Sequence, residues 1–246
     1  MRSLIALLLI ALSFSTAEAA PNNQYTPPEC YPTVETLPIY FVRSTLKYLD
    51  KDGVEKLNTI RGSTFLVDKN YWVTNSHVLN YGEDLETVEI TIADTTLTAE
   101  VILNDPAKDV AILYADSGDR QPIPLRSTPL KRRETLWAIG YPAIAGYYLM
   151  SFEGSTMGVD RGGQLVTSVV VFPGMSGGPT VRCNGDKLEA VSVSTALVST
   201  PLTSSKRVLQ DGTVVFHTES VNSGVSKSVP HIKRYLKRAK AIKEAQ

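Results

Sequence analysis

Short runs of β-favouring residues, separated by turn signals, repeat from residue 40 to residue 218 and constrain the fold more than any other feature of the chain. Six runs lie in the first half, at 40–49, 63–67, 71–74, 88–92, 98–102 and 110–114. Six more lie in the second half, at 135–139, 147–152, 164–172, 179–183, 188–197 and 214–218. A stretch rich in proline and arginine separates the two sets. Strands of this length and spacing are typical of β-barrels and β-sandwiches, so the sequence predicts an all-β fold in two halves.

Helical periodicity appears only near the end of the chain. Apolar residues at i, i+3, i+4 and i+7 define one helix face, and Pro230 suits the first turn. These residues are Ile232, Tyr235, Leu236 and Ala239. Residues 227–246 carry seven Lys or Arg and one Glu, so the helix is basic. We expect its apolar face to dock on the β-structure, and contact with an anionic surface or polymer is the alternative.

The N-terminal residues indicate export. A positively charged start precedes an apolar run at 4–14, and an A-x-A pattern follows at 17–19. This pattern predicts a signal peptide, because the run is shorter than the ~20 residues of a transmembrane anchor. We therefore expect a periplasmic or extracellular protein with no stable membrane insertion after signal removal. The residues that follow are rich in proline and polar groups and predict a tail along the domain.

Charge and composition exclude several functional classes. The chain has 25 basic and 25 acidic side chains and a formal net charge of zero, which argues against a nucleic-acid partner. Its two cysteines cannot form a four-thiolate zinc site. His, Cys and Asp do not cluster at metal-ligand spacing, so we expect no metal and no cofactor.

The two cysteines predict one disulfide. Pairing is the default in an oxidising compartment, and a bond between Cys30 and Cys183 would tie the tail to the second half of the chain. Two separate thiols are the alternative.

Three residues suited to nucleophilic catalysis follow one another in the order His, Asp, Ser. His77 comes directly after a β run, Asp109 opens another run, and Ser176 lies among glycines. A serine hydroxyl needs a neighbouring base, and the base needs a third group that fixes its tautomer. The glycines let backbone N–H groups approach a developing oxyanion. Asp105 is the alternative acid, although it precedes a proline as a loop residue does.

In this order the segments resemble the chymotrypsin/trypsin-like serine peptidases, and most of all the bacterial Deg/HtrA-type protease domain. The histidine motif is matched by 74–78 (TNSHV), the aspartate motif by 105–113 (DPAKDVAIL) and the nucleophile motif by 173–179 (PGMSGGP). Residues 138–142 (AIGYP) resemble the start of the family's second barrel, and 194–197 (STAL) resemble its substrate-pairing strand. The resemblance covers about residues 38–238.

The resemblance implies a fold of two packed six-stranded antiparallel β-barrels with a short C-terminal α-helix and the site in the cleft between the barrels. The expected divisions are a signal peptide at 1–19, an N-terminal tail at 20–37, the first barrel at 38–120, the second barrel with the helix at 121–238, and a basic C-terminal tail at 239–246.

The resemblance also implies a serine endopeptidase that hydrolyses proteins or peptides through an acyl-enzyme. His77 is then the general base, Asp109 orients it, and Ser176 is the nucleophile. The backbone N–H groups of Gly174 and Ser176 form the oxyanion hole. The residues implied to pair with the substrate backbone are Thr195, Ala196 and Leu197.

Three positions bear on specificity and activation. Val170, with Val171 nearby, is expected at the base of the primary pocket and favours small or apolar side chains, because burying an unpaired ammonium is costly. Met175 stands where trypsin-type enzymes carry an aspartate, so we expect no activation by an N-terminal ion pair. The chain ends soon after the predicted helix, so a PDZ domain is not expected.

Two other functions fit part of the pattern. The glycines around Ser176 also match the G-x-S-x-G nucleophile elbow of α/β-hydrolases, with Asp211 and His217 in the required order, which would make the chain a serine esterase. The absence of alternating helical patterns opposes that fold. A peptidase-like barrel that only binds peptides is the second alternative, which the intact triad opposes.

Overall fold

The structure is a computed structural model that describes residue 30 and residues 36–79, 84–160, 164–208 and 214–246. The expected signal peptide at 1–19 and nearly all of the expected tail at 20–37 lie outside the described residues.

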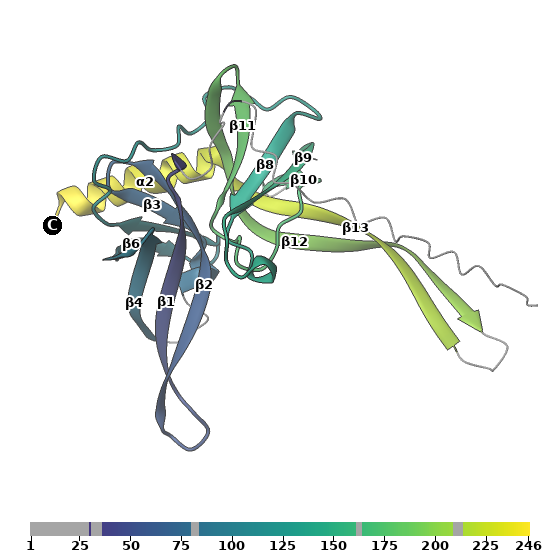
Figure 1. The fold of residues 1–246 in the computed structure, drawn as a ribbon, viewed down its shortest axis with the longest axis horizontal. Coiled ribbons are helices and arrows are strands. Elements are labelled where there is room, and N and C mark those ends of the chain that lie inside the picture. Colours follow the sequence, from purple (N-terminus) through teal and green to yellow (C-terminus); the bar gives the residue numbers. More distant parts are fainter. Residues whose placement is uncertain (1–29, 31–35, 80–83, 161–163, 209–213) are drawn as a thin grey trace, which may run out of the picture.

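The first half of the chain folds into an antiparallel sheet of seven strands (Figure 1). The strands are β1 (Ile39–Leu49), β2 (Glu55–Asp68), β3 (Tyr71–Thr74), β4 (Asp84–Ile92), β5 (Thr95–Thr98), β6 (Glu100–Asp105) and β7 (Val110–Tyr114). Their hydrogen-bonded order is β5-β4-β1-β2-β3-β7-β6. In β1, Val42 and Leu46 are buried and Arg43 is exposed, which is the alternation expected of a sheet with one covered face.

The second half forms a closed barrel of six strands. The strands are β8 (Thr135–Gly140), β9 (Met150–Val159), β10 (Gln164–Thr167), β11 (Pro179–Asn184), β12 (Lys187–Val208) and β13 (Val214–Ser228). The closed order is β10-β13-β12-β11-β8-β9. Strands β12 and β13 continue beyond the barrel as a long hairpin (Figure 1).

The predicted all-β architecture with two halves and a C-terminal helix is confirmed, but several strands have other bounds than the expected runs; for example, the run at 147–152 is strand β9 at Met150–Val159. The run at 98–102 is divided between β5 and β6, so the first half has seven strands. The run at 164–172 is a strand only to Thr167: the N–H of Ser168 still donates to the carbonyl of Ser155 in β9, but the Ser155 N–H donates to the Ser168 hydroxyl at 2.9 Å, so a side chain and not the backbone accepts it. Val170 and Val171 therefore lie in a loop.

One hydrophobic cluster joins both halves and the C-terminal helix. It contains Phe65 of the first sheet, Ile139 and Val181 of the barrel, and Ile232 of the helix. Each of these four side chains is fully buried. The two halves therefore share a core and hold their facing loops in a fixed arrangement.

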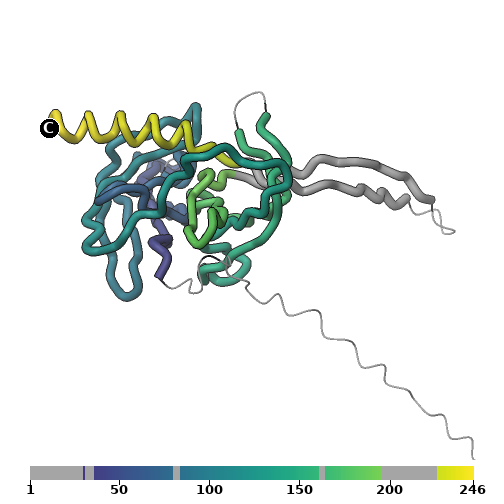
Figure 2. Tube along the Cα trace, turned by 90° about the horizontal axis from the view of Figure 1, so that it is seen from above, coloured from purple at the N-terminus to yellow at the C-terminus, as the bar shows by residue number. Residues whose placement is uncertain are grey.

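The C-terminal helix α2 (Val229–Glu244) lies across the first sheet as well as the barrel (Figure 2). Tyr235 donates a hydrogen bond of 2.6 Å from its hydroxyl to the carboxylate of Asp105, and Lys243 lies 2.6 Å from Glu100. The apolar face of the helix is docked, as its periodicity predicts. Residues 239–244, expected in a separate tail, continue α2 because Ala239 and Ile242 extend its apolar face.

Cys30 and Cys183 form the predicted disulfide, with their Cα atoms 5.5 Å apart. The bond attaches residue 30 to β11 across a sequence separation of 153 residues. Within the described part of the chain, no helix has the length and apolar character needed to cross a bilayer.

Candidate active site

His77 lies on a single helical turn that follows strand β3 of the first sheet. Strand β3 ends at Thr74, and the turn α1 (Ser76–Leu79) follows at once. Val78 and Leu79 are buried in a hydrophobic cluster of the first sheet and anchor the turn. The side chain of His77 keeps 28% of its surface exposed, so it can meet a substrate.

The carboxylate of Asp109 binds His77 twice. The ring Nδ1 of His77 lies 2.9 Å from Oδ1 and 3.0 Å from Oδ2, and the backbone N–H of His77 donates to Oδ1 at 3.0 Å. An ionised carboxylate only accepts hydrogen bonds, so Nδ1 carries the proton and the ring is fixed in one tautomer.

Electrostatics favour the charged form of Asp109. Burial alone raises the pKa of Asp109, but the hydrogen bonds from the His77 ring and backbone outweigh burial and leave the pKa below its ordinary value. The residue has a left-handed backbone with φ of 52°, which Asp tolerates better than most residues. This conformation turns its carboxylate toward His77 at the start of β7.

The alternative acid, Asp105, is occupied elsewhere. Its carboxylate accepts the Tyr235 hydroxyl at 2.6 Å and the backbone N–H of Lys108 at 3.1 Å. The hydrogen bond from Tyr235 is the largest cause of a lowered Asp105 pKa. Asp105 therefore fastens α2 to the loop after β6, and Asp109 is the acid that contacts His77.

Ser176 lies in the turn between residue 173 and β11. Met175 is fully buried in the barrel core and anchors this turn. At Gly177 the backbone has φ of 88°, and a Cβ there would overlap the Ser63 carbonyl and the Thr74 hydroxyl. Only glycine satisfies both conditions. The hydroxyl of Ser176 donates a hydrogen bond of 3.1 Å to the carbonyl of Thr195 in β12.

The segments of His77 and Ser176 meet at Gly62 in β2. A Cβ built on Gly62 would lie 2.7 Å from a methyl of Val78 and 3.0 Å from the carbonyl oxygen of Ser176. Val78, the residue after His77, and Ser176 itself are thus both in close contact with Gly62. The structure therefore brings the three residues of the predicted triad to one junction between the two halves.

Asn75 ties this junction together. Its side-chain amide donates 2.9 Å to the backbone carbonyl of Asp109 and 3.2 Å to the hydroxyl of Thr195. The side chain is fully buried. Asn75 belongs to the segment that matches the histidine motif, and the sequence assigns it no role; the one signal there is an amide two residues before His77.

The two backbone N–H groups expected in the oxyanion hole both lack an acceptor within the described part of the chain. Among the residues that the structure describes, neither the N–H of Gly174 nor that of Ser176 is donated to another group of the chain. The carbonyl of Pro173 accepts the N–H of Ala143 at 2.8 Å, and all described peptide bonds are trans. The N–H on that same peptide, which belongs to Gly174, therefore points away from Ala143.

The expected substrate-binding residues belong to two segments, the loop after β10 and strand β12. Val171 is buried, and Val170, which alternates with it, is half-buried. Thr195 is half-buried in β12, next to Ser194, which exchanges backbone hydrogen bonds with Gly177 and Gly178. Ala196 and Leu197 continue β12, and their side chains lie outside the described part of the structure.

The geometry disfavours the nucleophile-elbow alternative. Ser176 is followed by strand β11 and not by a helix. His217 pairs with Ser205 in the outer part of the β12–β13 hairpin. Ser205 lies ten residues along β12 from Thr195, and ten residues of extended strand span about 30 Å. Asp211 lies outside the described residues.

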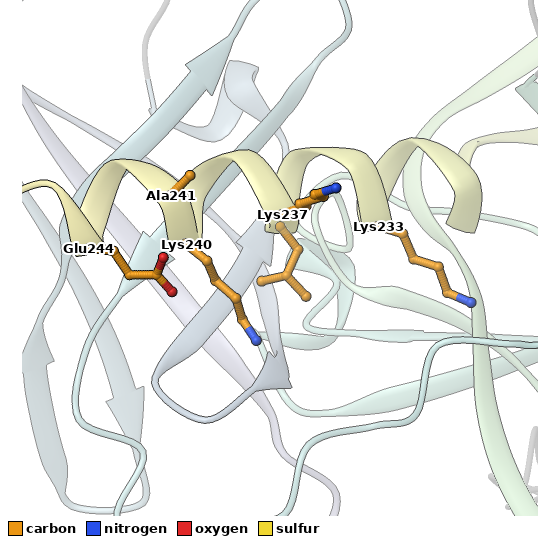
Figure 3. A pocket seen from close by; sticks show the side chains of 6 residues that line it. Lys233, Lys237, Lys240, Ala241 and Glu244 are labelled. Atoms are coloured by element: carbon orange, nitrogen blue, oxygen red, sulfur yellow. The ribbon is translucent and has the colours of Figure 1, made fainter.

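Two surface cavities lie away from the triad. One, of about 390 Å³, runs along α2 and is lined by Lys233, Lys237 and Lys240 among others (Figure 3). The other, of about 550 Å³, lies beside β9 and contains Arg126 and Met157. In the described part of the chain, His, Cys, Asp and Glu do not gather in threes as a metal ion would need.

Comparison with known sequences identifies one family. The family model described as "Trypsin-like peptidase domain" matches residues 62–188, which include all three triad positions. A "Probable periplasmic serine endoprotease DegP-like" of Pseudomonas fulva is 32% identical over 135 residues, which cover 51% of this chain and 27% of that protein. "Protease Do-like 1, chloroplastic" of Arabidopsis thaliana is 34% identical over 152 residues, 56% of this chain and 33% of that protein. The chain thus spans about a third or less of these relatives.

Solved structures share the fold. The serine endoprotease from Yersinia pestis superposes with a TM-score of 0.60 at 19% identity, over 88% of this chain and 69% of that one. The active form of the Rv3671c protease from M. tuberculosis gives a TM-score of 0.58 at 19% identity, over 80% and 79% of the two chains.

Proposed function

The chain belongs to the trypsin-like peptidase domain family, and from this premise we propose that it is a serine endopeptidase whose triad is His77, Asp109 and Ser176. The observation that carries the proposal is the contact of the His77 ring with the Asp109 carboxylate at 2.9 Å, beside the turn of Ser176. A carboxylate that fixes a histidine next to a serine is the arrangement that activates a hydroxyl for acyl transfer.

The proposed reaction follows from these positions. Asp109 holds the proton on Nδ1 of His77, so Nε2 is the atom that accepts the hydroxyl proton of Ser176. The Ser176 oxygen attacks the scissile carbonyl carbon, and the C–N bond then breaks as His77 returns the proton to the leaving amine. Water hydrolyses the resulting ester by the same proton transfers and regenerates Ser176.

One movement precedes this chemistry. The Ser176 hydroxyl donates to the Thr195 carbonyl at 3.1 Å, so it must give up this hydrogen bond and turn its proton toward His77. Such hydrogen bonds commonly shorten only when substrate is bound. A substrate strand that pairs with residues 195–197 would compete with the Ser176 hydroxyl for the Thr195 carbonyl and so favour this reorientation.

The oxyanion and specificity assignments extend the proposal. The N–H groups of Gly174 and Ser176 are the donors to the tetrahedral oxyanion. Val170 lies at the base of an apolar primary pocket, with Val171 nearby, and this pocket accepts small or apolar side chains and rejects an unpaired Lys or Arg. A cleavage profile on a peptide library, with strong preference for a basic residue before the cut, would contradict this assignment.

We also propose that residues 1–19 direct export and that the enzyme works in the periplasm or outside the cell. The apolar run at 4–14, the Cys30–Cys183 disulfide and the periplasmic names of several relatives support this location. Proteins and peptides are then its substrates.

Labelling with a fluorophosphonate tests the enzyme proposal directly. The full-length chain is expressed with its leader, and the exported form is labelled at pH 8 beside Ser176→Ala and Ser155→Ala. We expect one labelled peptide, containing Ser176, in the parent and in Ser155→Ala, where a half-buried hydroxyl of β9 is removed. A native-like parent that takes no label but binds peptides would instead be a binding module.

A further inference from the structure

Ser63 in β2 is a buried hub between the two halves of the molecule. Its side chain is fully buried, and each of its polar groups has a partner. Its N–H donates 2.8 Å to the carbonyl of Ser176, and its own carbonyl accepts the hydroxyl of Thr74 at 2.8 Å. Its hydroxyl donates 2.8 Å to the carbonyl of Gly174 and accepts the N–H of Tyr141 at 3.0 Å.

These partners belong to the segments whose relative positions matter for the proposed reaction. Thr74 ends the strand before His77, and Ser176 is the nucleophile. Gly174 provides an oxyanion N–H, and Tyr141 belongs to the loop after β8. One residue of the first sheet thus makes hydrogen bonds to all of these segments, three of them within the second half of the chain.

The hydroxyl of Ser63 closes a ring of hydrogen bonds around Gly174. On one side of Gly174, the Pro173 carbonyl is held by the N–H of Ala143 at 2.8 Å. On the other side, its own carbonyl is held by Ser63, whose oxygen also holds Tyr141 two residues before Ala143. Gly174 has φ of 94° and no Cβ, so without these contacts its peptides can rotate with little steric resistance.

We propose that Ser63 is a positioning residue for the oxyanion hole. Its hydroxyl fixes the direction of the Gly174 N–H, and its backbone N–H, bonded to the Ser176 carbonyl, fixes the position of the Ser176 backbone. This inference rests on the proposed peptidase function. Ser63 acts through Gly174 and Ser176 and does not itself touch the substrate. Its contribution therefore belongs to the transition state, where the oxyanion develops, and not to ground-state binding.

A merely structural role would give a different pattern from a positioning role. Ser63→Ala leaves the Gly174 carbonyl and the Tyr141 N–H without their partner, which lowers stability in either case. Only the positioning role also predicts that kcat falls while KM stays nearly constant. Ser44 and Ser192 provide matched controls: both are fully buried, and their hydroxyls have no hydrogen-bond partner among the described residues.

The experiment compares the exported parent with Ser63→Ala, Ser44→Ala and Ser192→Ala. For each variant, kcat and KM are measured on one peptide substrate, with the dissociation constants of a peptide boronate, which forms a tetrahedral adduct, and of the cleaved N-terminal product. We expect Ser63→Ala to lower kcat about 10- to 100-fold, to change KM less than about threefold, and to weaken the boronate by a factor similar to that of kcat. Product affinity and both controls should stay within about twofold of the parent.

The inference is overturned if Ser63→Ala keeps kcat and boronate affinity within twofold of the parent, or if its loss appears equally in product affinity. Should Ser63→Ala not fold, Ser63→Cys is measured in its place with the same two outcomes, because a thiol fills the site but donates only weakly. A parent that neither cleaves peptide nor takes the fluorophosphonate contradicts the proposed function. A parent that does both, with an insensitive Ser63, contradicts only this inference.

Discussion

The side-chain amide of Asn75 donates a hydrogen bond of 3.2 Å to the hydroxyl of Thr195, and so links the residue two before His77 to the strand that holds the Ser176 hydroxyl. The same amide donates to the backbone carbonyl of Asp109. A single buried side chain therefore connects Asp109, the segment before His77 and the barrel strand beside Ser176.

Replacing Asn75 should weaken both the fold and the reaction. Asn75→Ala leaves the Asp109 carbonyl without this donor, and a lost buried hydrogen bond of this kind costs about 1–3 kcal/mol. We expect that decrease in the free energy of unfolding by urea, together with a lower kcat/KM on a peptide substrate. Asn58→Ala, at an exposed position, is the control. Unchanged unfolding and kinetics in Asn75→Ala would show that the link is dispensable.

The choice between the two aspartates can be tested by kinetics. Asp109→Asn offers an amide where a carboxylate now fixes the His77 tautomer, and the same change in Ser–His–Asp triads lowers kcat about 10⁴-fold. Asp105→Asn weakens the contact with Tyr235 instead, so it should lower thermal stability while kcat stays within about threefold of the parent. A larger loss of kcat in Asp105→Asn than in Asp109→Asn would reverse the assignment.

The candidate triad could be proposed from the sequence alone because its motifs are local in sequence. Each of the three residues, His77, Asp109 and Ser176, lies in a short segment whose residue types indicate the proposed chemistry. The terminal helix was also predictable, since its apolar period is visible in one sequence window.

The supporting contacts could not be predicted in the same way. Ser63 and Gly174 are 111 positions apart, and nothing in the β run around Ser63 distinguishes a hub from an ordinary strand residue. The placement of α2 on the first sheet is similar, because periodicity reveals an apolar face but not its partner. Such contacts depend on how two halves pack, and a single sequence does not encode that packing locally.

Removal of the disulfide should lower stability considerably. The bond between Cys30 and Cys183 closes a loop of 153 residues, for which the chain-entropy model gives about 5 kcal/mol. We expect the double variant Cys30→Ser with Cys183→Ser to unfold at lower urea concentration, with a decrease in the free energy of unfolding that approaches this figure. Reductant should shift the parent toward the double variant and leave the variant itself unchanged. Equal midpoints for parent and variant would contradict this expectation.

Acid should destabilise the protein partly through Glu189. Burial raises the pKa of this carboxyl, but hydrogen bonds from Arg182 and Asn184 outweigh burial and hold the pKa below its ordinary value of 4.5. The unfolded chain therefore takes up this proton first as the pH falls, so the stabilisation is complete above the unfolded pKa and is lost as pH falls through the folded pKa. We expect the stability difference between the parent and Glu189→Gln to shrink below pH 4.5. The exposed Glu153→Gln serves as the control, and a difference that stays constant from pH 6 to pH 3 would argue against the ion pair.

Two glycines separate backbone strain from steric overlap at the site. Gly177 and Gly53 both have positive φ, of 88° and 73°, but a Cβ on Gly177 would overlap Ser63 and Thr74, whereas one on Gly53 meets no atom within 4 Å. Gly53→Ala should therefore lower the free energy of unfolding by only about 1–2 kcal/mol, the cost of a left-handed L-residue, and leave kcat unchanged. Gly177→Ala must in addition displace the turn that carries Ser176 from β2, so we expect fluorophosphonate labelling and peptide cleavage to be lost. Labelling of Gly177→Ala at the parent's rate would mean that contact with β2 does not position Ser176, because the displaced serine would still react.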